Sequence, residues 1–358
     1  MRVVFDQKLM AGDYPDPAVL FFTDLVKRMA WLSPDDEFVI LLPPHRKPKE
    51  ALPDNMFFVR TGNTATSLLG SHFFRRMRLP GDVKALDPDV FVGIDNPLTY
   101  RYKSGKLLLL LDPPSVENLD KSWNRTLASV SQVLCFANIN SLVIPMEKLL
   151  RLDPPFPAQE MRATWGRKES IKVQYSGGHD YFLFSGDLDS RHQLLDLLKA
   201  FSQFKQRQQS SMRLYFAGKD TKWTSTFEKL LDSYKYRSDV VILRNPSPDD
   251  VRELMAAAYA LVYPALEDSL PVTVLQAMSA GLPVIASKLP VLEEWAGDSI
   301  IQVSGSVSEG FSKAMQQLFK EESGRDLLIE KADALQQHDP ENLPRQFLGL
   351  LRKASETK

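Results

Sequence analysis

Short apolar runs alternate with longer polar or amphipathic segments along the whole chain. In the first half these runs occupy 2–6, 38–42, 55–59, 89–94 and 106–111, and in the second half 181–185, 212–218, 240–243, 260–264 and 282–286. Apolar runs of this length, bounded by turn residues, are typical of buried strands. Strands that alternate with helices predict parallel, doubly wound sheets, so the expected fold class is α/β.

The length of the chain and one proline-rich segment predict two domains. At 358 residues the chain exceeds the usual size of one core. Prolines 154, 155 and 157 lie within 152–166, which indicates a crossover between domains. We expect domain boundaries near 1–165 and 166–339, with a last helix in 340–358.

Composition narrows the class of protein and its partners. Apolar residues make up 44% of the chain and charged residues 25%, which is typical of soluble globular proteins. The net charge of −1 argues against a nucleic-acid partner. The single Cys135 excludes an internal disulfide and a cysteine-based zinc site. No secretory signal or membrane-spanning run is visible, so a cytoplasmic location is expected.

The stretch 263–287 has the layout of an anion-binding unit. A buried strand leads through an acidic loop, 266–271, into a predicted helix over 272–280. We expect Ser269 to cap this helix and Gly281 to follow its end. The free amides at a helix start favour anions, and ligands of open α/β sheets lie at the carboxyl ends of the strands.

The residues of this stretch resemble the donor-binding signature of family-4 (group 1) retaining glycosyltransferases, which have the GT-B fold. The resemblance rests on Gln276-Ala277-Met278 and on Gly281-Leu282-Pro283-Val284. In the family two glutamates stand eight residues apart, at the positions of Asp268 and Gln276. The resemblance implies that Asp268 meets the sugar and Gln276 the ribose. It also implies that the amides of Ser269, Leu270, Pro271 and Val272 face phosphate or sugar.

A second part of the resemblance concerns the cations that hold the donor diphosphate. Over 181–201 this chain keeps the arginine of the family pattern as Arg191. It has His192 where the family has a lysine and Asp187 where the family has an arginine. Lys219 could supply a replacement cation or be a surface lysine. Arg244, where the family has a glycine, either blocks the pocket or offers a guanidinium fork to phosphate.

The first half departs further from the family. The loop 7–17 holds one glycine, Gly12, where the family has several. Leu111 replaces the histidine of a His-Asp pair and Asp112 keeps the aspartate. The run 72–78 mixes aromatic and basic side chains, which suits either peripheral contact with an anionic membrane or the solvated face of a helix.

These observations leave two functional hypotheses open. The first is a divergent glycosyltransferase that moves a sugar from a nucleotide sugar to a glycan or lipid-linked acceptor with retention, in the synthesis of polysaccharide or cell-surface glycan. The second is a catalytically silent homologue that binds a glycan or nucleotide, or partners an active glycosyltransferase. In both, the resemblance implies an acceptor-side domain at 1–165, with the helix of 340–358 crossing back onto it, and a donor domain at 166–339 across a central cleft.

Neither hypothesis involves a metal or another cofactor. The resemblance implies that side chains and the helix dipole meet the phosphate charge. The one Asp-x-Asp sequence considered for a metal, Asp187-Leu188-Asp189, occupies the place where the family has cations. The proposed catalytic residues are therefore Asp268 and His192. The expected donor-binding residues are Arg191, Lys219, Arg244, Ser269, Leu270, Pro271, Val272 and Gln276.

Overall fold

The computed structural model divides the chain into two compact units. The first comprises Met1–Pro155 and Asp339–Lys358, and the second Phe156–His338. The structure describes residues 1–6, 17–43, 51–61, 79–97, 104–111, 121–136, 144–145, 147–154, 156, 162–336 and 339–356. The loop 7–16, the run 72–78 and Asp112 therefore lie outside the described residues.

The first unit is built on a parallel sheet. Within the described residues the strand order is β3-β2-β1-β4-β5-β6-β7. Neighbouring strands pair in parallel throughout, for example Val3 with Phe38 and Val90 with Gly105. The strands are β1 (Arg2–Phe5), β2 (Glu37–Leu42), β3 (Met56–Arg60), β4 (Val90–Ile94), β5 (Gly105–Leu110), β6 (Gln132–Cys135) and β7 (Leu149–Arg151).

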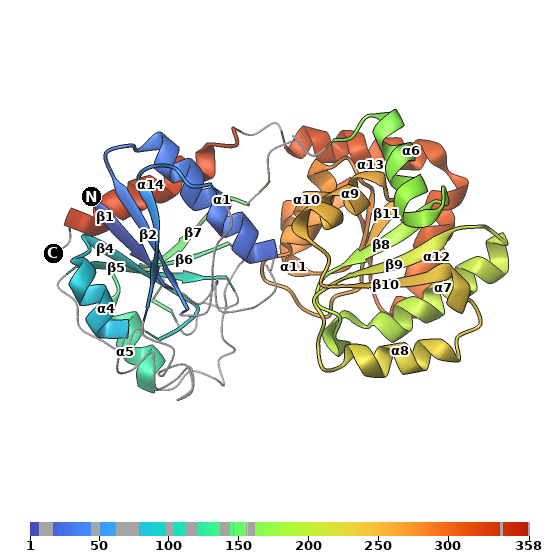
Figure 1. The fold of residues 1–358 in the computed structure, drawn as a ribbon, viewed down its shortest axis with the longest axis horizontal. Coiled ribbons are helices and arrows are strands. Elements are labelled where there is room, and N and C mark those ends of the chain that lie inside the picture. Colours follow the sequence, from blue (N-terminus) through green and yellow to red (C-terminus); the bar gives the residue numbers. More distant parts are fainter. Residues whose placement is uncertain are drawn as a thin grey trace. The chain divides into compact units, whose positions relative to one another are not determined.

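The last helix of the chain packs onto this first sheet. Helix α14 (Asn342–Glu356) contacts β4, β5 and α1 (Pro17–Leu32), and Figure 1 shows α14 beside α1. The carbonyl oxygen of Ala354 would lie only 2.1 Å from a Cβ added to Gly105, so the approach of α14 requires glycine there. Phe347 and Leu351 of α14 are fully buried. The other described helices of this unit are α4 (Leu79–Leu86) and α5 (Lys121–Ser129).

The second unit has its own parallel sheet, in the order β10-β9-β8-β11-β12-β13. Strand β8 lies at its centre and pairs with β9 on one side and β11 on the other. The strands are β8 (Tyr181–Ser185), β9 (Arg213–Gly218), β10 (Val240–Arg244), β11 (Ala260–Tyr263), β12 (Val284–Ser287) and β13 (Ile301–Val303).

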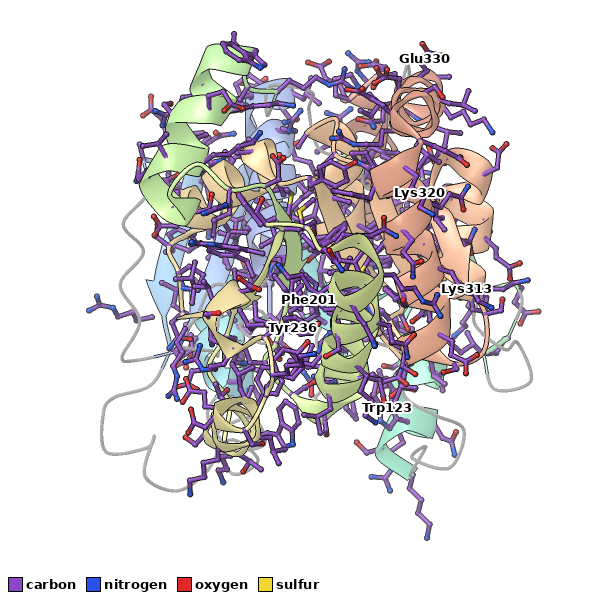
Figure 2. The ribbon with its side chains drawn as sticks, turned by 90° about the vertical axis from the view of Figure 1, so that its right-hand side faces the viewer. Trp123, Phe201, Tyr236, Lys313, Lys320 and Glu330 are labelled. Carbon is purple, nitrogen blue, oxygen red and sulfur yellow. The ribbon has the colours of Figure 1, made fainter. Side chains whose placement is uncertain are left out.

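Helices surround the second sheet (Figure 1). They bury aromatic side chains against it: Phe201 and Phe204 of α7 are fully buried, and the Phe204 ring meets Phe182 of β8 edge-on. In Figure 2 Phe201 lies toward the middle of the view, whereas Lys313, Lys320 and Glu330 lie on its right-hand side, on α12 and α13. The helices are α6 (Trp165–Ser176), α7 (Leu194–Gln208), α8 (Thr224–Asp232), α9 (Pro248–Ala257), α10 (Val272–Ser279), α11 (Pro290–Trp295), α12 (Val307–Lys320) and α13 (Glu322–Leu335).

The predicted α/β class is confirmed, and each apolar run named above overlaps an observed strand. Gly281 follows the end of α10 with φ 67°, as predicted. The predicted cap of α10 was wrong, because Pro271 occupies the cap position and no side chain caps the helix. Helix α6 was not predicted, since only Ile171 and Ser176 of its residues are buried and it lacks a clear apolar stripe.

No helix in the described part of the chain is both long and apolar enough to cross a membrane.

Candidate functional site

The loops that follow β8 and β11 are joined to each other. The two strands are adjacent and parallel, so their carboxyl ends lie at the same edge of the sheet. The Leu266 amide donates to the Arg191 carbonyl at 3.2 Å, and Gln193 Nε2 donates to the Pro264 carbonyl at 3.2 Å. These bonds bring the cationic residues of one loop to the acidic residues of the other.

His192 is held on several sides. It ends a short 3-10 turn, Ser190–His192, and its Nδ1 lies 2.9 Å from Asp189 Oδ1. Its ring meets Phe184 edge-on at 5.2 Å and Tyr263 at 5.9 Å between centroids. Only 12% of the side chain is exposed, so its orientation is well determined by packing.

Asp268 is fixed by a buried residue of β11. The Tyr263 hydroxyl donates to Asp268 Oδ2 at 2.5 Å, and the Leu270 amide donates to Oδ1 at 2.8 Å. Tyr263 contacts the ring of His192 as well. The two predicted catalytic residues, His192 and Asp268, are therefore brought together around a single aromatic ring.

Arg191 is drawn toward two carboxylates of its own loop. Its Nε donates to Asp189 Oδ2 at 2.8 Å, and its Nη2 lies 3.6 Å from Asp187 Oδ2. Burial alone would raise the pKa of Asp189, but the Arg191 hydrogen bond and the adjacent His192 outweigh it and lower that pKa. Asp189 is thus held as a carboxylate, and the Arg191 side chain remains 61% exposed.

Lys219 follows the neighbouring strand β9 at the same edge. A Cβ added to Gly218 would lie 1.7 Å from the Gly186 carbonyl oxygen, so glycine at 218 lets the ends of β8 and β9 meet. The Leu188 amide donates to the Lys219 carbonyl at 3.0 Å. Within the described residues no carboxylate pairs with the Lys219 ammonium, which leaves it available to an anion.

Arg244 is already engaged by carboxylates. Its Nε donates to Glu228 Oε1 at 2.9 Å, its Nη2 pairs with the other Glu228 oxygen, and its Nη1 lies 3.3 Å from Asp220 Oδ2. The Glu228 hydrogen bond raises the pKa of Arg244. The Arg244 guanidinium, which the sequence predicted as a possible phosphate ligand, is thus bound to protein carboxylates in this structure.

The amides at the start of α10 are less open than expected. The Leu270 amide donates to Asp268 and the Val272 amide to the Leu270 carbonyl at 2.7 Å, while Pro271 has no amide hydrogen. Of the predicted segment, only the Ser269 amide has no hydrogen-bond acceptor among the described residues. Gln276, on α10, is half-buried.

Two residues of the site were not predicted from sequence. Asp189 was considered only as a metal ligand and rejected, although its spacing of three from His192 suits a contact across one helical turn. Tyr263 was assigned only to a strand. No group of three or more His, Cys, Asp or Glu residues suited to a metal occurs among the described residues.

In the first unit, Leu111 is buried and its amide donates to Asp95 Oδ1 at 2.6 Å. The side chain at this position is therefore part of the core of its own unit.

Curated relatives match only part of the chain. An O-antigen chain mannosyltransferase of Salmonella typhimurium, RfbU, is 24% identical over 98 residues, which is 27% of this chain and 28% of the relative. O-antigen chain mannosyltransferase B of Escherichia coli is 24% identical over 147 residues, 41% of this chain and 39% of the relative. The chain thus spans well under half the length of either relative.

Solved structures match the whole chain. Sucrose-phosphate synthase from Thermosynechococcus elongatus has a TM-score of 0.81 at 14% identity and full coverage of both chains. HepE of Anabaena in complex with UDP-glucose has a TM-score of 0.78 at 13% identity, with 99% and 100% coverage. WaaG, a glycosyltransferase involved in lipopolysaccharide biosynthesis, has a TM-score of 0.75 at 14% identity, with 98% and 99% coverage. The predicted GT-B fold is confirmed.

A family model matches most of the second unit. Residues 167–335 match the model described as glycosyl transferases group 1. That range contains all ten predicted site residues, Asp268, His192, Arg191, Lys219, Arg244, Ser269, Leu270, Pro271, Val272 and Gln276. The second unit therefore matches the group 1 glycosyl transferases over most of its length.

Proposed function

We propose that this protein is a glycosyltransferase that moves a sugar from a nucleotide sugar to a glycan or lipid-linked acceptor, with retention of configuration. The observation that carries the proposal is the junction at the carboxyl ends of β8 and β11. There the loop of Arg191 and His192 is hydrogen-bonded to the loop of Asp268, and Tyr263 contacts both His192 and Asp268, within a unit that matches the group 1 family.

The residues of this junction suit the two ends of a nucleotide sugar. Arg191, His192 and Lys219 would hold the diphosphate and stabilise the charge that develops on it as it departs. Asp268 accepts hydrogen bonds only, so it would bind a hydroxyl of the sugar. Gln276 would bond the ribose through its neutral amide, a weaker contact than a carboxylate makes.

No metal or other cofactor takes part in the proposed reaction. Preorganised cations and dipoles stabilise a departing anion without a metal, and each such contact is worth about 3 kcal/mol of barrier. The cations of this site all come from side chains at the ends of β8 and β9.

The relatives suggest where such a transfer would occur. Two are O-antigen chain mannosyltransferases, and WaaG is involved in lipopolysaccharide biosynthesis. We infer a role in cell-surface glycan synthesis at the cytoplasmic face of the membrane, with the protein bound peripherally there. HepE binds UDP-glucose, which supports a nucleotide sugar as the donor class.

One observation favours the second hypothesis, a silent homologue that binds a glycan, a nucleotide or an active glycosyltransferase. Carboxylates already engage two of the expected phosphate ligands: Asp187 and Asp189 lie against Arg191, and Glu228 and Asp220 against Arg244. A site in which carboxylates accompany the cations attracts a diphosphate less strongly.

A turnover assay separates the two hypotheses. Purified protein is incubated with UDP-, GDP- and ADP-sugars and a mixture of lipid-linked and soluble glycan acceptors, with EDTA present, and release of nucleoside diphosphate is measured. An enzyme releases one of the three diphosphates, and the loss of release in His192→Gln assigns it to this site. The anomeric configuration of the product, read by NMR, tests retention. Binding of a nucleotide without release, at protein concentrations near 10 µM, would instead support the silent homologue.

A further inference from the structure

Asp189 holds both Arg191 and His192 of the loop after β8. Its Oδ1 accepts from the Arg191 amide at 3.0 Å and lies 2.9 Å from His192 Nδ1, while its Oδ2 accepts from Arg191 Nε at 2.8 Å. Only 17% of its side chain is exposed. A carboxylate shared in this way fixes the position of two neighbours at once.

The contact with His192 also determines where that ring carries its proton. An ionised carboxylate only accepts hydrogen bonds, so Nδ1 must be the donor in the 2.9 Å contact. A neutral His192 then has its hydrogen on Nδ1 and a lone pair on Nε2. The partner of one ring nitrogen commonly sets the state of the other in this way.

The free nitrogen of His192 faces the end of β8. His192 Nε2 lies 3.5 Å from the position that a Cβ would take on Gly186, and no side chain occupies that position. Phe184 and Tyr263 pack edge-on against the ring. Among the described residues, the charged and titratable groups of the elements packed against it are Asp187, Asp189 and Arg191 on its own loop and Tyr263 and Asp268 from β11 and the loop after it.

We propose that Asp189 is a positioning residue that fixes His192 with its hydrogen on Nδ1 and holds Arg191 beside it, so that His192 Nε2 and the Arg191 guanidinium bind the diphosphate of the donor. The identity of the ligand rests on the proposed function. When a diphosphate binds, Nε2 takes up a proton from solvent and donates a hydrogen bond to a phosphate oxygen, and Asp189 stabilises the resulting imidazolium through Nδ1. The pair Asp189–His192 thereby replaces the lysine that the family has at this position.

The first test needs no ligand. Protein labelled with 15N in its five histidines is examined by NMR at pH 8, where an ordinary imidazole is neutral, and His192→Gln identifies the His192 signals. We expect Nδ1 of His192 to carry the hydrogen in the native protein, and Asp189→Ser to move the hydrogen to Nε2. Serine still caps the 3-10 turn, so the turn is retained while the carboxylate is lost. Asp187→Asn, in the same loop, is the matched control and should leave the signals unchanged. A hydrogen on Nε2 in the native protein, or no change in Asp189→Ser, would overturn the proposal.

The second test measures the ligand side. UDP, GDP and ADP are titrated into the native protein at pH 8 by calorimetry, in two buffers of different ionisation enthalpy. The nucleotide that binds should be accompanied by proton uptake, and Asp189→Asn should weaken it about 10- to 100-fold and reduce the uptake. Binding with unchanged affinity and uptake in Asp189→Asn would overturn the role of Asp189. If none of the three nucleotides binds, the proposed function fails, and the NMR experiment still decides the tautomer.

Discussion

The hydroxyl of Tyr263 donates a 2.5 Å hydrogen bond to Oδ2 of Asp268. Tyr263 is the last residue of β11 and is almost fully buried, so the strand itself holds the carboxylate of the following loop in place. The other oxygen of Asp268 accepts from the Leu270 amide. Aspartate is shorter than the glutamate that the family has here, and these two hydrogen bonds fix the position of the Asp268 carboxylate.

We predict that Tyr263→Phe weakens donor binding by about tenfold and lowers the free energy of unfolding by about 1 kcal/mol, because Asp268 loses its buried donor. Calorimetry and denaturant unfolding measure the two effects. Tyr259→Phe is the matched control. Tyr259 directly precedes the first residue of β11, and its hydroxyl donates to the Leu318 carbonyl. The control should lose stability and keep binding. Equal binding in both variants would contradict the role of Tyr263.

Arg244 should contribute little to donor binding. Its guanidinium is held by Glu228 and Asp220, so Arg244→Ala should change the dissociation constant of the donor nucleotide less than threefold, whereas His192→Gln should change it at least tenfold. Glu228→Gln, which loosens the fork, should strengthen binding. A tenfold loss of affinity in Arg244→Ala would instead indicate that Arg244 binds the phosphate. It would contradict the prediction that Arg244 stays paired with Glu228 and Asp220.

The docking of α14 depends on Gly105. A methyl group there would meet the Ala354 carbonyl, so Gly105→Ala should lower the free energy of unfolding of the first unit by about 1–3 kcal/mol. Gly349→Ala is the control on the same helix. Nothing lies within 4 Å of its added Cβ, and alanine in a helix should stabilise by about 0.5–1 kcal/mol. Denaturant unfolding followed by circular dichroism compares them, and a Gly105→Ala variant as stable as native protein would contradict the close approach.

The lowered pKa of Asp189 makes its contribution to stability depend on pH. The folded protein keeps this carboxylate ionised below the ordinary aspartate value of about 3.9, so its stabilising effect is complete above that value. As pH falls through the lower folded-state pKa, the effect is lost. The stability difference between native protein and Asp189→Asn should therefore be larger at pH 5 than at pH 3. A difference as large at pH 3 as at pH 7 would show that Asp189 does not titrate with a depressed pKa.

The sheet of the second unit could be predicted from sequence because its strands are apolar and lie between turn residues. The run 181–185 coincides with β8, and Gly281 ends α10 in the left-handed conformation that glycine favours. Helix α6 could not be predicted in the same way. Its exposed Trp165 and Val173 and its two buried positions give no apolar stripe, so tertiary contacts determine where it lies.

The candidate site was predicted by residue type but not by arrangement. His192, Arg191 and Asp268 were named from their positions in the family pattern, and the structure places them at adjacent strand ends. The pairing of Arg244 with Glu228, which is 16 residues away, depends on how α8 packs beside β10 and has no local sequence signal. The hydrogen bonds of Asp189 and Tyr263 likewise follow from loop geometry, so neither residue was recognised as part of the site.

The measurement that tests the central claim most directly is a thermal-shift screen with UDP-, GDP- and ADP-sugars and their nucleotides, on native protein and on the His192→Gln, Lys219→Ala and Gln276→Ala variants. A ligand at one hundred times its dissociation constant stabilises by about 2.7 kcal/mol, which raises the melting temperature by a few degrees for a unit of this size. We predict such a rise in melting temperature for the nucleotide sugars of one of the three bases, and a smaller rise in all three variants. The absence of a rise with any of these compounds, or an equal rise in native protein and the three variants, would contradict a donor site at the ends of β8 and β11.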